Sequence, residues 1–324
     1  YESEFVVDVC STNLEIYAKV QSKPVVQSDN SVGRGGFVLA GELFFADGTA
    51  ETVVTDSTWL SRLENEYLSP RTVDYTNKRD EWINAVEIPS VWNVKPSQIK
   101  NLVEKPVSRE VYVTNGSETV EFAKSLDKIY SAYVRLNIKT KSEYKIKFTS
   151  SEVNSVSEQI HIVKGIGDSE YYSHEMDSIG EYKIEVQSKG GLPVSIQTDI
   201  IFVHYPSEEI GEFKCSDDML NRINELCRWT VKICRQSIEL DSPVHQENLF
   251  CCGDYNIESL VNNYATGDYS LTRFDLLRMG NYLHTTNGWQ YNRSYSLIWI
   301  HMLYQYFMYS GDETILKDVE HGIE

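Results

Sequence analysis

The chain has 324 residues, which is enough for two or three domains, each with a core of its own. Hydrophobic residues make up 41% of the sequence and charged residues 24%, as is usual for globular proteins. The net charge of −18, from 48 acidic and 30 basic residues, repels nucleic-acid phosphates and anionic lipids, so we expect neither nucleic acid nor a membrane as a partner.

The longer, N-terminal part of the sequence predicts β-structure. Short runs rich in β-branched and aromatic residues are separated by turn signals, of which Asp47-Gly48 is typical of a tight hairpin. Residues 62–82 are polar and irregular, which predicts a surface excursion. A change in composition near Lys105-Pro106 divides this part into two antiparallel β-sandwich domains, 1–105 and 106–207, with one larger sandwich as the alternative.

In the third region, 208–324, apolar residues recur at steps of three and four, which is typical of helices. A capping hydroxyl at Ser216 followed by two acids begins an amphipathic helix, on which Cys227 and Cys234 share one face and predict core packing. Further helices are predicted over residues 255–265, 271–283, 295–310 and from 312 onward. Their lengths and short connections predict antiparallel hairpins.

One irregular, acid-rich loop interrupts these helices, between Asp241 and Asp254, and Pro243 keeps it from being helical. If the carboxyl groups of Asp241, Glu247 and Asp254 converge, their mutual repulsion raises the pKa of one of them. A protonated acid beside ionised carboxylates is the arrangement that splits a glycosidic bond. A metal site in which His245 joins the acids is the rival interpretation, and a solvated connection is the plain one.

Trp289 follows a predicted turn at Asn287-Gly288. An aromatic ring in a loop offers a stacking surface for a sugar, and it serves equally well in packing, so both interpretations stay open. No cysteine pair has the spacing of a zinc site, and no helix follows the glycine-rich residues 33–36. We therefore expect no metal and no cofactor.

The residues Asp241-Ser242-Pro243, Glu247 and Gly253-Asp254 resemble, in type and spacing, the catalytic motif of bacterial α-L-rhamnosidases, glycoside hydrolase family 78. The likeness continues on both sides of this motif. Stretches similar to the family's catalytic domain are 211–221, 296–300 and 309–312, and stretches similar to its β-sandwiches are 35–59 and 132–136. The resemblance covers nearly the whole chain, in the order of the family.

This resemblance implies a multidomain β + α fold, in which antiparallel β-sandwich domains precede the first helices of an (α/α)6 barrel. It also implies a glycoside hydrolase that cleaves terminal α-L-rhamnose by an inverting acid/base mechanism, with a rhamnose-containing oligosaccharide or glycoside as its partner. Glu247 matches the general acid. Asp241 and Asp254 match acids that hold the sugar hydroxyls, and we add His245 and Trp289 as candidate substrate-binding residues.

The sequence also departs from the family. His245 and Asn248 lie at or beside positions where the family usually has arginine, and Ser242 and Cys251 replace its cysteine and tryptophan. A hydrolase for a different sugar and a non-catalytic carbohydrate-binding protein are therefore the alternatives.

The region after residue 208 predicts fewer helices than six hairpins need. We expect an incomplete barrel, a general base beyond Glu324, and no useful turnover by this chain alone. Glycan breakdown favours a periplasmic or secreted protein, although the unpaired cysteines argue against it.

Overall fold

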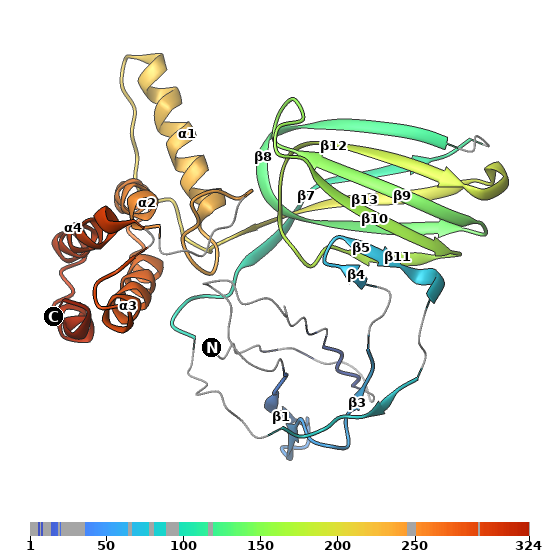
Figure 1. Cartoon of the computed structure of the whole chain (residues 1–324), viewed down its shortest axis with the longest axis horizontal. Coiled ribbons are helices and arrows are strands. Elements are labelled where there is room, and N and C mark those ends of the chain that lie inside the picture. The colour runs from blue at the N-terminus through green and yellow to red at the C-terminus, as the bar shows by residue number, and fades with distance from the viewer. Residues whose placement is uncertain are drawn as a thin grey trace. The chain divides into compact units, whose positions relative to one another are not determined.

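In a computed structural model, the described residues are 6, 8, 14–18, 20, 36–63, 67–77, 81–88, 97–115, 119–244, 251–290 and 292–323. The chain divides into two compact units, which we describe separately (Figure 1). The first consists of Tyr1–Asn65 and Lys78–Ser97, and the second of Glu66–Asn77 and Gln98–Glu324. The domain division at residues 105 and 207 stays a prediction.

The described part of the first unit contains two small antiparallel sheets. They pair β1 (Ala40–Phe44) with β2 (Ala50–Val54), and β3 (Leu60–Ser61) with β6 (Ile83–Asn84). The predicted hairpin at Asp47-Gly48 is confirmed, because the Phe45 N–H donates to the Thr49 carbonyl at 2.9 Å. Gly48 has a φ of +86°, a conformation that glycine adopts without strain.

The second unit is built on one nine-stranded sheet. Its strands are β4 (Tyr67–Ser69), β5 (Thr72–Asp74), β7 (Val103–Val113), β8 (Thr119–Thr140), β9 (Glu143–Ser151), β10 (Gln159–Ile166), β11 (Ser169–Tyr172), β12 (Asp177–Ser188) and β13 (Val194–His204). The short 3-10 helices η1 (Tyr75–Asn77) and η2 (Lys189–Gly191) accompany them. The strand order is β4-β5-β10-β9-β12-β8-β13-β7, and β11 also pairs with β8.

Strand β8 joins the two halves of this sheet (Figure 1). It pairs with β12 up to Ala132 and with β13 from Ala132 onward. Buried and more exposed side chains alternate along it, and Val134, Leu136 and Ile138 lie in the core. This alternation is the pattern expected for antiparallel strands with one face on a core, and the predicted β-sandwich architecture is confirmed.

The predicted surface excursion at 62–82 is wrong for its middle part, because residues 67–74 form β4 and β5 of the large sheet. Strand β5 pairs in parallel with β10, whereas the other described pairs are antiparallel. Val73 is fully buried there. The polar residues around this valine gave no local signal of a strand, because the partner strand β10 lies far along the sequence.

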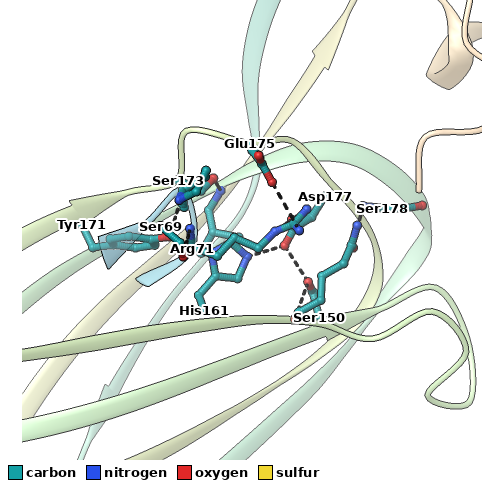
Figure 2. A network of polar contacts seen from close by, with 12 residues as sticks. Ser69, Arg71, Ser150, His161, Tyr171, Ser173, Glu175, Asp177 and Ser178 are labelled. Atoms are coloured by element: carbon teal, nitrogen blue, oxygen red, sulfur yellow. Dashed lines mark hydrogen bonds and ion pairs between the residues drawn. The ribbon is translucent and has the colours of Figure 1, made fainter. Parts of the chain in front are cut away.

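A buried polar network fastens this segment to the sheet (Figure 2). The Asp177 carboxylate is fully buried, and it accepts hydrogen bonds from Ser150 Oγ at 2.7 Å and from Arg71 Nε at 3.1 Å. His161 contacts the same carboxylate through Nε2 and the Tyr171 hydroxyl through Nδ1, the latter at 2.8 Å. Burial alone would raise the pKa of Asp177, but the hydrogen bonds and the Arg71 charge outweigh it, so the pKa is lowered.

The helices follow the sheet in the second unit (Figure 1). They are α1 (Asp218–Cys234), α2 (Cys252–Ala265), α3 (Ser270–Thr285), α4 (Arg293–Ser310), α5 (Thr314–Asp318) and α6 (Glu320–Ile323). The prediction of the first four is confirmed, and the predicted last run is divided into α5 and α6. Asp217 rather than Ser216 caps α1, since its carboxylate accepts from the Met219 N–H at 2.8 Å. Cys227 is exposed, so its predicted core packing is wrong, whereas Cys234 is buried.

The C-terminal half of α1 and the residues that follow it pack on the sheet. Trp229 donates from Nε1 to the Ile129 carbonyl at 2.8 Å, and Gln236 donates to the Val203 carbonyl at 2.9 Å. Helices α2 to α5 form a second core, in which Trp299 is almost fully buried. None of the described helices is both long enough and apolar enough to cross a membrane.

Candidate active site

The chain enters the acid-rich loop directly from the end of α1. A short antiparallel bridge joins Arg235 to Glu239, and the Leu240 N–H donates to the Cys234 carbonyl at 3.0 Å. This tight return fixes the start of the loop at Asp241, which is half-buried. Because these contacts are made by the backbone, they fix the position of Asp241 beside the last turn of α1.

Asp254, at the other end of the loop, lies in the first turn of α2. An acid there interacts favourably with the helix dipole. Its side chain is exposed, and the Tyr295 hydroxyl donates to Oδ2 at 3.4 Å. A Cβ at Gly253 would lie 2.8 Å from the Tyr295 ring, which explains why glycine precedes Asp254. Tyr295 therefore packs directly over the end of the loop.

Trp289 lies in the connection between α3 and α4, and 56% of its surface is exposed. The Arg293 guanidinium stacks 4.6 Å from the centre of its ring. The next residue, Gln290, is buried and accepts a hydrogen bond from the Cys252 thiol in the first turn of α2. The Trp289 connection thus lies against the start of α2, the helix whose first turn carries Asp254.

Two of the candidate residues, the catalytic Glu247 and His245, lie outside the described residues, as does Asn248. The structure places Asp241 and Asp254 at the two ends of the loop and Trp289 on the connection that contacts α2. Their roles in binding or catalysis stay predictions.

Two buried carboxyl groups that interact with each other lie close in sequence to the two ends of the loop. Glu239 is fully buried and Glu258, on α2, is 8% exposed. Burial raises the pKa of Glu258 well above its ordinary value, and the negative charge of Glu239 raises it further. Burial also raises the pKa of Glu239, although the charge of Arg235, whose Nε lies 3.4 Å from Oε1, opposes this.

A third buried acid, Asp275 on α3, extends this cluster. Its carboxylate accepts hydrogen bonds from the Glu239 N–H at 2.9 Å and from Arg278 Nη1 at 3.0 Å. Burial raises the pKa of Asp275 to about 7, against the attraction of Arg278. The buried Cys234 thiol is also part of the cluster, and burial followed by the charge of Glu258 raises its pKa. We call Cys234, Glu239, Glu258 and Asp275 the acid cluster.

The acid cluster is not among the sites that the sequence predicts. Glu239 and Asp275 each lie between apolar residues, in Ile238-Glu239-Leu240 and Phe274-Asp275-Leu276. An acid inside such a run is a signal of a buried carboxyl group, because charged residues are seldom fully buried. Tyr295 left no comparable signal, since its contact with Asp254 depends on how α2 and α4 pack.

Among the described residues, no group of three or more histidine, cysteine, aspartate or glutamate side chains is arranged to hold a metal ion.

Residues 208–319 match the sequence model of the bacterial α-L-rhamnosidase six-hairpin glycosidase domain. The match contains both ends of the loop, the acid cluster and Trp289. Over these residues the chain is similar to that domain. No curated protein matches the chain by sequence.

Solved structures similar to the chain include several rhamnosidases. The α-L-rhamnosidase of Streptomyces avermitilis, in complex with L-rhamnose, is 16% identical, with a TM-score of 0.63 over 88% of this chain and 32% of that chain. The α-L-rhamnosidase of Dictyoglumus thermophilum is 17% identical, with a TM-score of 0.62 over 88% of this chain and 37% of that chain. The family 78 rhamnosidase of Bacillus sp. GL1 is 21% identical, with a TM-score of 0.56 over 63% of this chain and 24% of that chain.

These likenesses concern the fold. The chain spans about a third of the length of the Streptomyces and Dictyoglumus proteins. Both alignments cover most of this chain, so the large sheet followed by six-hairpin helices has the architecture of an α-L-rhamnosidase. The predicted fold class is confirmed.

Proposed function

We propose that this chain is part of a glycoside hydrolase that removes terminal α-L-rhamnose from oligosaccharides or glycosides, with inversion at the anomeric carbon. The family match over residues 208–319 carries this proposal, because it includes the whole loop from Asp241 to Asp254. Two similar structures hold the sugar in question: the Streptomyces protein in complex with L-rhamnose and a Klebsiella oxytoca rhamnosidase with rhamnose bound.

Glu247 is the proposed general acid. An acid in this role must be protonated when the substrate binds, so that it can give its proton to the oxygen of the departing group. Nearby carboxylates raise the pKa of such a group. The fixed loop ends at Asp241 and Asp254 supply two carboxylates from opposite sides of Glu247 in the sequence.

Asp241 and Asp254 are the proposed partners of the sugar hydroxyls, because carboxylates accept strong hydrogen bonds from hydroxyl groups. Trp289 is proposed to stack on an apolar face of the sugar, and its exposed ring is available for this contact. His245 is proposed to contact the sugar from within the loop. An inverting reaction also needs a base that activates water on the far face of the sugar, and we assign that role to none of the described residues.

A hydrolase for a different sugar is the second candidate. Its support is the replacement of arginine by His245 and Asn248 at or beside the sugar-binding positions implied by the family motif. Arginine offers five donors in a fixed fork, whereas asparagine offers two and neutral histidine one. A sugar that arranges its hydroxyls differently from rhamnose would suit the altered set.

The test is hydrolysis of aryl α-L-rhamnosides by this chain and by the longest product that its gene encodes. Glu247→Gln is compared with the wild type on a phenyl and on a 4-nitrophenyl rhamnoside. Loss of a general acid costs about 100-fold or more. The loss should be larger for the phenyl substrate, because phenolate leaves less readily without a proton. Glu225→Gln, the same change at an exposed position of α1, is the matched control and should keep full activity.

Proton NMR of the first sugar released identifies its anomer. The β-anomer supports inversion, and the α-anomer contradicts it. Equal activity of Glu247→Gln and wild type on both substrates would refute the acid assignment. Binding of L-rhamnose in a calorimeter without turnover in any form would favour a carbohydrate-binding protein. Turnover of another glycoside alone would favour the second candidate.

A further inference from the structure

The two ends of the acid-rich loop meet at the pair Glu239 and Glu258. Glu239 lies two residues before Asp241, and Glu258 lies about one turn of α2 after Asp254. Both side chains are buried, with exposed fractions of 0% and 8%. The two carboxyl groups interact, so they connect the chain that leads into the loop with the helix that leaves it.

The pair is stable only if one of its members carries a proton. Neither carboxyl oxygen of Glu239 accepts a hydrogen bond from a described N–H or hydroxyl group, although the Arg235 guanidinium forms an ion pair with it at 3.4 Å. Two ionised carboxylates in this buried position would repel each other. One proton on Glu258 replaces that repulsion with a hydrogen bond to Glu239.

We propose that this shared proton fastens residues 239–244 to the first turns of α2, and that its release to solvent loosens the contact. The proton resides on Glu258 and is donated to the Glu239 carboxylate. Its release leaves two facing carboxylates, one of which Arg235 stabilises. Glu239 and Glu258 are in this account positioning residues for the two ends of the loop.

The electrostatics of the pair agree with this arrangement. The pKa of Glu258 is raised by burial first and then by the charge of Glu239, so Glu258 is the member that keeps the proton. Arg235 limits the rise in the pKa of Glu239. Among the described residues, titratable and charged groups around the pair or its neighbour Asp275 come from three helices and the chain between them: Cys234 and Arg235 at the end of α1, Asp241 after them, Asp254 and Tyr255 on α2, and Asp275 and Arg278 on α3.

Acids outnumber bases in this surrounding set, so raising the pH adds repulsion without adding a counter-charge. Two backbone N–H groups also hold the segment, because the Glu239 N–H donates to the Asp275 carboxylate and the Leu240 N–H donates to the Cys234 carbonyl. The first ends on an acid of the same cluster. Any effect of this shared proton on catalysis rests on the proposed function, but the proton-dependent contact itself can be measured without substrate.

The test is amide hydrogen exchange at about pH 5 and about pH 9, with rates corrected for the pH dependence of exchange in an unfolded peptide. Peptides within 236–244 and 252–262 report on the two sides of the contact. We expect their protection to fall about tenfold or more at the higher pH, while peptides of β8 stay unchanged. Glu258→Gln should keep its protection at both pH values, because its amide donates to Glu239 permanently. Glu225→Gln, at an exposed position of α1, should behave as the wild type.

Unchanged protection in the wild type would overturn the proposal, and so would a loss that persists in Glu258→Gln, which would place the titration at Asp275 instead. If Glu258→Gln does not fold, Glu239→Gln tests the same point by removing the other charge. An inactive protein with the expected exchange pattern would refute the proposed function alone. An active protein without that pattern would refute the shared proton alone.

Discussion

Two buried carboxylate clusters in the second unit show opposite electrostatic designs. Around Asp177, one carboxylate is matched by the Arg71 guanidinium, the His161 ring and the Ser150 hydroxyl, and its pKa is lowered (Figure 2). In the acid cluster, three carboxyl groups and a thiol face two guanidinium groups, and their pKa values are raised.

The comparison shows which cluster keeps a constant charge and stabilises the fold, and which cluster changes its protonation state with pH. A carboxylate with enough donors is stable when ionised and keeps its charge over the ordinary pH range. A surplus of buried acids has to take up protons instead, so its state depends on pH near neutrality. The first arrangement fastens β4 and β5 to the sheet, and the second includes residues just before and just after the loop that carries the proposed catalytic residues.

The largest expected effect comes from breaking the matched cluster. Asp177→Asn leaves Arg71 and His161 without the buried carboxylate that they share, and removal of one partner from a buried ion pair costs about 3–5 kcal/mol. Urea unfolding at neutral pH measures the loss. Glu170→Gln, an exposed side chain on β11, is the control and should change the free energy of unfolding by less than about 0.5 kcal/mol. An equally small loss for Asp177→Asn would show that the network does not hold the segment.

An intermediate effect is expected from the pH dependence of the acid cluster. A carboxyl group whose pKa is raised by folding stabilises the protein below its unfolded pKa, and this contribution is lost as the pH rises through the folded value. For Asp275 the window runs from its ordinary value of 3.8 to about 7, which corresponds to a loss on the order of 4 kcal/mol. Glu258→Gln should lose less stability than the wild type between about pH 5 and about pH 8, because burial and the charge of Glu239 raise the pKa of Glu258 and this acid no longer ionises in the variant.

Urea unfolding at the two pH values measures this difference, and Glu225→Gln serves again as the control. The same slope in Glu258→Gln and wild type would mean that Glu258 does not titrate in this range.

The smallest effect is expected from Arg71→Met. Arg71 is partly exposed, and Ser150 and His161 remain on the Asp177 carboxylate, so the loss at neutral pH should be about 1–2 kcal/mol. The lowered pKa of Asp177 stabilises the fold above 3.8, and this stabilisation is lost as the pH falls through the lower folded value. Acid unfolding should therefore begin at a higher pH in Arg71→Met than in the wild type. Identical acid transitions would contradict the role of the Arg71 charge.

Local patterns in the sequence were sufficient for much of the fold. Helices α1 to α4 follow from the spacing of apolar residues, and the β1–β2 hairpin follows from Asp47-Gly48. Strands β4 and β5 do not follow from local patterns, because their stability depends on parallel pairing of β5 with β10 and on the distant Asp177. The apolar residues in the first half of α1 were expected on a core-facing side, yet Met219 and Leu226 are exposed.

The candidate site was predictable to a similar extent. Three carboxylates in a stretch that also holds Pro243 and Gly253 revealed the loop, and family resemblance supplied the proposed role of Glu247. The acid cluster was not predictable as a unit, because the pairing of Glu239 with Glu258 and Asp275 depends on how α2 and α3 return to the end of α1.

The most direct test of this contrast is carbon-13 NMR titration of the side-chain carboxyl groups, assigned with Glu258→Gln and Asp177→Asn. We predict that Glu258 stays protonated well above the ordinary glutamate pKa of 4.5, whereas Asp177 stays ionised below the ordinary aspartate value of 3.8. Titration of both groups at their ordinary values would contradict the account.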